Sequence, residues 1–262
     1  MHNRISVVIV TKNEEKNIRK CIESVYDWVD EIIVVDSYST DKTVEICKEY
    51  GAKIFQHAFN GFGELKNFAI SKATGDWILC IDADERVTPS LREEIKYCLS
   101  CSKRNGYIAY LIPRKTIAWG KWIKMLYPLY QIRLFKKGYA SFSNKKVHET
   151  IIASGHVGKL KNPLIHVTYK TMSDYFEKFN RYTDLQAQEL LAQGEKSLCY
   201  GFIQGLKVFF WYFFIKRGFM DGYHGFLLSI LAFLYQIVSY WKLNELKYST
   251  RNDKDGSRKE KY

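Results

Sequence analysis

The stretch Trp77-Ile-Leu-Cys-Ile-Asp-Ala-Asp-Glu85 decides the fold. Its run of five apolar residues predicts a buried strand that ends at Asp82. The acidic residues therefore lie at the carboxyl end of a strand, which is the edge of an open α/β sheet where ligands bind. Two carboxylates separated by one residue suit a divalent cation such as Mg2+ or Mn2+. The alternative is an Asp-rich turn that caps the next helix.

Three earlier segments show the same order of an apolar strand, a polar turn and a helix. These strands are expected at residues 5–10, 31–36 and 52–56. Four strands that alternate with helices predict a mostly parallel sheet with right-handed crossovers. A further helix is expected to start at Pro89, with Thr88 as its cap, and to end near Cys101.

Beyond Gly106 the pattern changes to β-like segments without obvious helices between them. These segments lie at residues 107–113, 131–135 and 147–152, and a long amphipathic helix follows from Ser173 to about Gly194. We therefore expect a mixed second half of the same domain, which covers residues 1–170 and has an acceptor half from about residue 105. A helical appendage is expected at 171–246, and a charged, disordered tail at 247–262.

The composition narrows the classes of partner. The chain has 262 residues, a net charge of +12 and six cysteines without a regular framework. This charge suits nucleic acid, anionic lipid or phosphorylated substrates. The irregular cysteines and the absence of a signal segment predict a cytoplasmic chain with reduced thiols.

Two apolar, aromatic blocks follow near the carboxyl end, at residues 202–215 and 226–241. Each is shorter than the ~20 apolar residues that cross a bilayer. We therefore expect two helices that lie in the interface of the inner membrane, on its cytoplasmic face. The alternative is a helical hairpin that packs on the core or forms an oligomer contact.

Three motifs in this order resemble family-2 glycosyltransferases, which have the A-type nucleotide-sugar fold. They are Val7-Val-Ile-Val-Thr-Lys-Asn-Glu-Glu15, Val34-Val-Asp-Ser-Tyr-Ser-Thr-Asp-Lys-Thr43 and Asp82-Ala-Asp84. Later motifs resemble the lipopolysaccharide-core glucosyltransferase branch: Arg133-Leu-Phe135, Val147-His-Glu149 and Arg217-Gly-Phe-Met-Asp-Gly222. The chain departs from the wider family at Ser37 and Tyr38, where aspartate and glycine are usual.

A nucleotide-sugar donor needs a cation between its diphosphate and an acidic edge. We expect Asp84 to bind Mg2+ or Mn2+, with Asp82 as a second ligand or closer to the ribose. Thr11, Glu14 and Asp36 are expected to bind uracil and ribose through hydrogen bonds. The alternatives are a simple turn residue for Thr11 and helix capping for Asp36.

The acceptor side needs a group that removes a proton from a hydroxyl. Glu149 is the candidate base, mainly because of the resemblance to the core-glucosyltransferase branch, and His148 is either the base or its orienting neighbour. Arg133 would bind a phosphate through its bidentate fork. Surface positions are the alternative for Glu149 and for Arg133.

These residues predict an inverting, metal-dependent transferase that moves a hexose, most simply glucose from UDP-glucose, to a lipid-linked lipopolysaccharide-core or related glycan. One alternative is transfer to polyprenyl phosphate, an acceptor that needs no base. Another is a non-enzymatic basic module that binds membrane or nucleic acid, although no nucleic-acid partner is expected.

Overall fold

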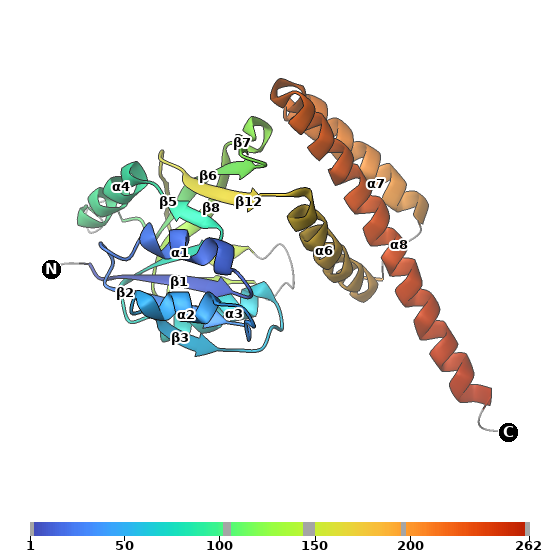
Figure 1. Ribbon diagram of the computed structural model, residues 1–262, viewed down its shortest axis with the longest axis horizontal. Coiled ribbons are helices and arrows are strands. Elements are labelled where there is room, and N and C mark those ends of the chain that lie inside the picture. The colour runs from blue at the N-terminus through green and yellow to red at the C-terminus, as the bar shows by residue number, and fades with distance from the viewer. Residues whose placement is uncertain (1–2, 102–105, 144–149, 195–197, 260–262) are drawn as a thin grey trace. The chain divides into compact units, whose positions relative to one another are not determined.

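The computed structural model describes residues 3–101, 106–143, 150–194 and 198–259 (Figure 1). The chain forms two compact units. The first comprises residues 1–118 and 127–168, and the second comprises residues 119–126 and 169–262.

The first unit is built on a mixed β-sheet. Its strands are β1 (Ile5–Thr11), β2 (Glu31–Asp36), β3 (Lys53–Gln56), β4 (Trp77–Asp82), β5 (Glu85–Val87), β6 (Ala109–Ala118), β8 (Leu129–Lys136), β11 (Val157–Lys159) and β12 (Leu164–Tyr169). The order is β3-β2-β1-β4-β8-β6-β12-β5, and β11 pairs with β6. Strands β3, β2, β1 and β4 are parallel, whereas β8 is antiparallel to both β4 and β6. The expected α/β sheet is confirmed, and the mixed half begins where the sequence pattern changes.

Helices cover both faces of this sheet. They are α1 (Glu15–Glu23), α2 (Thr43–Glu49), α3 (Phe62–Lys72) and α4 (Pro89–Ser100). Helices α1, α2 and α4 share one apolar core with Val7 and Ile9 of β1, whereas α3 shares the other with Val8 and Val10. Successive residues of a strand point to opposite faces, so a strand covered on both sides reads as a continuous apolar run. The Thr88 side chain accepts the Leu91 N–H at 3.2 Å and caps α4 as predicted.

A small antiparallel hairpin stands beside the sheet. It consists of β9 (Ala140–Phe142) and β10 (Ile151–Ala153). The side-chain amide of Asn67 on α3 bonds both the N–H and the C=O of Phe142, at 2.8 and 2.9 Å. The start of the connection between the two strands is therefore anchored to α3.

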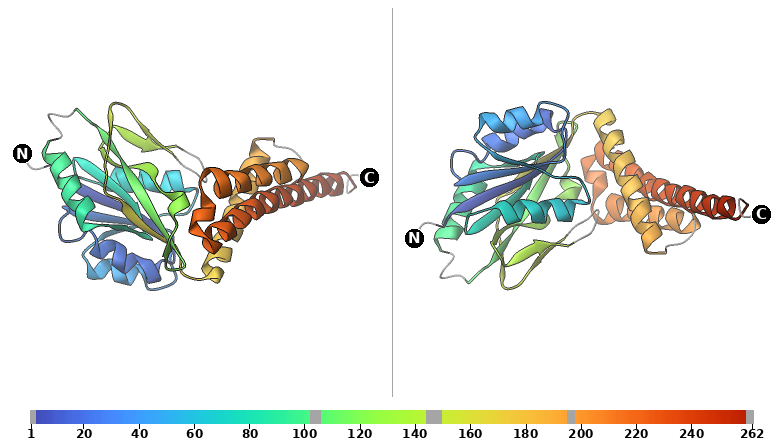
Figure 2. Two further views of the ribbon diagram at one scale, coloured as in Figure 1. Left: turned by 90° about the horizontal axis from the view of Figure 1, so that it is seen from above. Right: turned by 90° about the horizontal axis from the view of Figure 1, so that it is seen from below.

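The second unit is helical. It contains η1 (Lys124–Leu126), α6 (Met172–Ala192), α7 (Leu198–Phe210), η2 (Trp211–Ile215), η3 (Gly218–Asp221) and α8 (Tyr223–Lys259), together with the short β7 (Lys121–Trp122). Helices α7 and α8 lie side by side as an antiparallel pair (Figure 2). Residues 119–126 join this unit because the buried Asp221 carboxylate accepts the N–H groups of Lys124 and Met125.

Two segments of this unit are long and apolar enough to cross a membrane by length and composition. They are Leu198–Ile215 and Tyr223–Tyr248. Helix α8 continues to Lys259, where the sequence predicts a disordered tail from Lys247. The low apolar content predicts disorder, but extending a helix that has already formed costs much less than starting one, so α8 can continue into this segment.

A buried carboxylate joins the strands at the end of the sheet opposite to their carboxyl ends. Glu31 of β2 accepts hydrogen bonds from the Ser6 hydroxyl of β1 and from Thr74 and Gly75, which lead into β4. Its other oxygen is 2.9 Å from the Lys53 ammonium of β3. Burial disfavours the ionised form of Glu31, but the hydrogen bonds from Lys53, Ser6 and Thr74 favour it more strongly. Together they lower the Glu31 pKa to about 2. This carboxylate helps to fix the relative positions of all four parallel strands.

We predict that Glu31→Gln destabilises the protein at pH 7 by about 1–3 kcal/mol, since it removes a charged acceptor from several buried donors. Because the folded pKa lies below the unfolded value, the stabilisation is complete above about pH 4.5. It is lost as the pH falls from there toward 2, so the deficit of the variant should be smaller at pH 3.5 than at pH 7. Urea unfolding at both pH values measures this deficit. The exposed Glu45→Gln serves as the control, and an equal deficit at both pH values would contradict the prediction.

Candidate functional site

The carboxyl ends of three neighbouring strands bring the predicted residues to one edge. Thr11 of β1 is in register with Asp36 of β2, and Val10 is in register with Asp82 of β4. Asp36, Thr11 and Asp82 therefore follow one another in this order along the same edge of the sheet. The acidic turn 83–84 continues directly from Asp82 and leads into β5.

The loops after β1 and β2 are bonded to each other. The Asn13 side chain accepts the Thr40 N–H, and the Glu14 N–H donates to the Thr43 hydroxyl, both at 2.8 Å. The Glu14 carboxylate accepts a hydrogen bond from the Asn17 amide at 2.8 Å. Glu14 thus lies at the expected rim, in contact with the first turn of its own helix α1.

Asp36 is fully buried and serves its own loop. One oxygen accepts the Ser39 N–H at 2.9 Å, and the other accepts the Ser39 hydroxyl. This turn places Tyr38 in the left-handed conformation, with φ 57°. The left-handed region favours glycine, so Tyr38 carries backbone strain that a glycine would avoid.

Two hydroxyls at the same edge lack a hydrogen-bond partner among the described residues. They are Thr11 Oγ1 and Ser37 Oγ, and both side chains are buried. The Ser37 N–H bonds the Thr11 carbonyl at 2.9 Å, so the two residues are neighbours. A buried hydroxyl without a partner costs about 1–3 kcal/mol, and a polar ligand at this edge would relieve that cost.

Asp82 lies between two cations. Lys66 Nζ of α3 is 2.9 Å from its Oδ1, and an Arg133 guanidinium nitrogen of β8 is 2.6 Å from its Oδ2. The same Arg133 nitrogen is 2.8 Å from the fully buried Glu85, whose other oxygen accepts the Asp82 N–H. Arg114 is 3.8 Å from Glu85. The acidic turn is therefore neutralised from inside the protein.

Lys66 and Arg133 keep the Asp82 carboxyl ionised. Burial disfavours its ionised form, but the charges of Arg133 and Lys66 outweigh burial and hold the pKa of this carboxyl well below its usual range. Arg133 is itself buried, so the alternative of a surface position is wrong. A contact between Arg133 and a donor phosphate stays a prediction.

Asp84 has a different neighbour. His166 Nε2 of β12 is 3.4 Å from Asp84 Oδ2, and His166 Nδ1 is buried without a partner among the described residues. The Asp84 carbonyl accepts the Val167 N–H at 2.9 Å, which ties the turn to β12. A carboxylate and an imidazole thus stand together at the rim, a pair of ligands suited to a divalent transition metal such as Mn2+.

Sequence reasoning did not single out Lys66 or His166. A signal for Lys66 exists, because it lies beside Leu65 and Ala69 on the buried face of α3, and lysine is seldom buried unless it is paired. His166 gives no such signal, since only the pairing of β12 with β5 brings it to Asp84. Glu149 and His148 lie outside the described residues.

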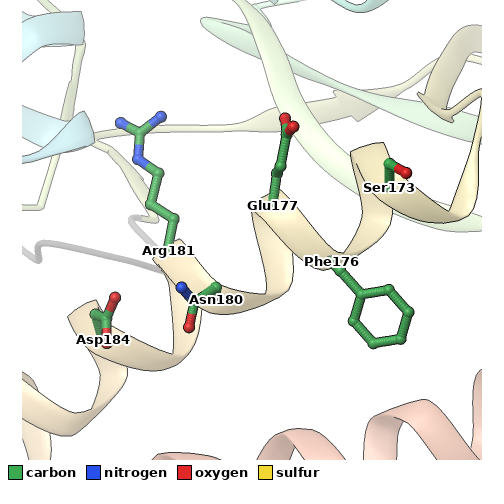
Figure 3. Close-up of a pocket in the computed structure, with 6 residues that line it drawn as sticks. All are labelled: Ser173, Phe176, Glu177, Asn180, Arg181 and Asp184. Carbon is green, nitrogen blue, oxygen red and sulfur yellow. The ribbon is translucent and has the colours of Figure 1, made fainter.

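One open hollow of about 700 Å³ lies along α6 in the second unit. Its lining residues are Ser173, Phe176, Glu177, Asn180, Arg181 and Asp184. Glu177 and Arg181 project from the same side of the helix, and Phe176 projects from the other (Figure 3). Asn180 and Asp184 already bind Lys242 of α8, each at 2.6 Å. Because one helix supplies every lining residue, the hollow does not define a ligand site.

Comparisons with known proteins agree with the motifs at this edge. The chain is 35% identical to an uncharacterized glycosyltransferase of Rickettsia typhi, over 95% of this chain and 89% of that protein. It is 27% identical to LpsC, a lipopolysaccharide core biosynthesis glycosyltransferase of Rhizobium meliloti, over 91% of each chain. The structure of S. aureus TarS in complex with UDP-GlcNAc aligns with a TM-score of 0.49 and 17% identity, over 89% of this chain and 81% of that chain. The model of the Glycosyl transferase family 2 matches residues 6–152, and the chain belongs to this family.

Proposed function

We propose that this family-2 glycosyltransferase transfers a hexose, most simply glucose from UDP-glucose, to a lipid-linked lipopolysaccharide-core or related surface glycan. The observation that carries the proposal is the pair of carboxylates in one rim turn, Asp82 and Asp84. Lys66 and Arg133 hold the first ionised, and the second stands beside His166. The resemblance of the later motifs and the name of the Rhizobium meliloti relative support the acceptor class. The acceptor would be reached at the cytoplasmic face of the inner membrane.

Asp84 and His166 are the residues that would hold a divalent metal, with Asp82 next to them. No cluster of three or more His, Cys, Asp or Glu ligands occurs among the described residues. A two-ligand site nevertheless fits this chemistry, because such cations take their remaining ligands from substrate phosphates and water. When bound, Mn2+ or Mg2+ would act as a Lewis acid that stabilises charge on the leaving diphosphate.

Thr11 and Ser37 would receive the nucleoside of the donor. Their unpartnered hydroxyls are the buried polar groups at this edge that a uracil or ribose could satisfy. Glu14 borders the same loop. Asp36 would act through Ser39, because it holds the turn that positions Ser37.

Glu149 would remove the proton from the acceptor hydroxyl. In a single displacement the acceptor oxygen bonds the anomeric carbon, the bond to the diphosphate breaks, and the proton moves to the base, which inverts the anomeric configuration. His148 would orient the base or replace it. The described residues on each side of this segment are bonded to each other, since the Ser143 N–H donates to the Thr150 carbonyl at 2.9 Å.

The first test of the donor site is Thr11→Val. The valine has a similar shape but no hydroxyl, so we expect the melting temperature to stay the same or rise while UDP binds about 5–10-fold more weakly, equivalent to about one hydrogen bond. Thr11→Ser keeps the hydroxyl and should keep the affinity. Calorimetric titration with UDP and Mn2+ measures the effect. Unchanged affinity in Thr11→Val would remove Thr11 from the donor site.

The metal proposal is tested by His166→Ala. We expect Mn2+ to bind about 10–100-fold more weakly in the presence of UDP, because a ligand or an orienting neighbour of Asp84 is lost. Electron paramagnetic resonance of free Mn2+ reports this binding without turnover. The exposed His156→Ala is the control, and equal Mn2+ binding by wild type and His166→Ala would contradict the assignment.

The base is tested by Glu149→Gln. We expect turnover to fall by about 10²–10⁴-fold, because the amide cannot accept the hydroxyl proton, while UDP affinity stays unchanged. Turnover is measured as UDP release with a glycan acceptor. Full turnover in the variant would instead favour an acceptor that is already an anion, such as polyprenyl phosphate.

A further inference from the structure

The turn that joins α7 to α8 exposes large apolar side chains. We call residues 210–226 the hairpin tip. Ile215 is 64% exposed, Met220 61% and Tyr223 73%. The other exposed apolar residues of the tip are Phe210, Trp211, Phe214, Phe219 and Phe226. Water-soluble monomers seldom expose apolar side chains in such a group, so the tip has the character of a binding surface.

The contact between α7 and α8 uses glycines of α7 and leaves large apolar side chains of α7 exposed. A Cβ added at Gly201 would lie 2.6 Å from the Tyr240 Cβ, and one at Gly205 would lie 2.8 Å from the Phe233 ring. Small residues thus line part of the helix contact, whereas Phe202 and Leu206 of α7 are exposed. Glycines four residues apart at the contact, with apolar side chains outside, are typical of helices in lipid.

The exposed charged side chains of the tip are positive and therefore favour an anionic partner. The sequence from 198 to 244 contains one carboxylate, Asp221. That carboxylate is 2% exposed, and it accepts the Lys124 and Met125 N–H groups at 3.1 and 2.8 Å. Lys216 and Arg217 of the tip are exposed, as is Lys124 in the segment that Asp221 holds beside η3. The charged side chains that the tip presents to solvent are therefore cationic.

This charge argues against a second copy of the chain as the partner. A symmetric contact through two tips would bring Lys216 and Arg217 close to the same cations of the other copy, with no exposed carboxylate on either tip to pair with them. A bilayer with anionic headgroups offers both acyl chains for the apolar residues and phosphates for the cations.

In the half of the hairpin away from the tip, one face of α8 packs on α6. Lys242 of α8 bonds Asp184 and Asn180 of α6, and the Tyr235 hydroxyl donates to the Tyr182 carbonyl at 3.2 Å. A complete crossing of the bilayer by α8 would carry these polar groups and the charged α6 into the acyl region. The tip, in contrast, can enter the interface without disturbing these contacts.

We propose that the hairpin tip inserts into the headgroup and acyl boundary of an anionic bilayer, with Lys216 and Arg217 at the lipid phosphates. Arg217 in the left-handed conformation, with φ 57°, and Gly225 pressed against the Gly218 carbonyl fix the shape of the turn. The tip would therefore enter the bilayer interface without a change in its backbone conformation. This inference deepens the membrane-associated part of the proposed function, and it requires neither donor nor metal.

The test is co-sedimentation of the full chain with vesicles of phosphatidylcholine that contain about 30% phosphatidylglycerol. We expect the double variant Ile215→Asp, Phe219→Asp to lower the partition coefficient at least ~10-fold, since it removes two inserting groups. Lys216→Gln with Arg217→Gln should lower it about 10–30-fold on these vesicles and leave binding to pure phosphatidylcholine unchanged. Tyr248→Asp, also at an exposed position of α8 but outside the tip, should bind as wild type does.

Two further measurements keep the test decisive. Brominated lipids should quench wild-type tryptophan fluorescence, and Trp211→Phe should lose most of that quenching. We also expect every variant to bind UDP with the affinity of the wild type. This result would show that the substitutions leave the first unit intact. Unchanged vesicle binding of the double aspartate variant would overturn the proposal. So would a wild-type dimer in solution that this variant converts to a monomer. Either result would leave the donor-site proposal in place, because vesicle binding does not depend on turnover.

Discussion

The ion pairs that Asp82 makes with Lys66 and Arg133 are the interaction on which the site depends. They join the end of β4 to α3 and β8, and Arg133 extends them to Glu85 in β5. A buried ion loses several kcal/mol of hydration, which only close opposite charges offset, so each member holds the others in place. The turn between Asp82 and Glu85 is thereby fixed at both ends, and this fixes the position of Asp84.

The strand ends could be predicted from the sequence because they depend on local features. An apolar run that stops at Asp36 or Asp82 marks the end of a buried strand, and the helices between the strands force parallel order. The partners of these residues could not be predicted in this way. Arg133 faces the acidic turn because β8 runs antiparallel to β4, with Leu134 opposite Leu79. The spacing of residues in the sequence does not predict how β8 pairs with β4. Asp36 bonds Ser39 within the loop, whereas α2 begins at Thr43 without a side-chain cap, so Asp36 does not cap this helix. A contact between Asp36 and ribose stays a prediction.

The two units bury apolar surface in opposite ways. In the first unit Val7 to Val10 are covered on both faces of the sheet, so a polar edge is left for a charged ligand. In the second unit Gly201 and Gly205 of α7 pack against Tyr240 and Phe233 of α8, whereas other aromatic side chains, such as Phe202, remain exposed. Family membership makes the chain an enzyme rather than a binding module with a vestigial edge. On the two proposals made above, donor chemistry would belong to the first unit and attachment to lipid would belong to the second.

The rim of the proposed donor site contains a strained residue and buried hydroxyls without partners. Both lower the stability of the fold, and packing elsewhere in the first unit must offset this loss. Tyr38 is left-handed, which costs about 1–2 kcal/mol for a residue other than glycine, and its side chain is 56% exposed. The hydrogen bonds of Asp36 to Ser39 hold this turn, and the turn keeps the Ser37 hydroxyl buried beside Thr11. An unpartnered hydroxyl inside a rigid loop is poorly solvated before any ligand arrives. A nucleotide that bonds it would therefore gain more than it would from a hydroxyl in water, and little ordering of the loop would be needed. The strain at Tyr38 and the unpartnered hydroxyls thus belong to one preorganised edge.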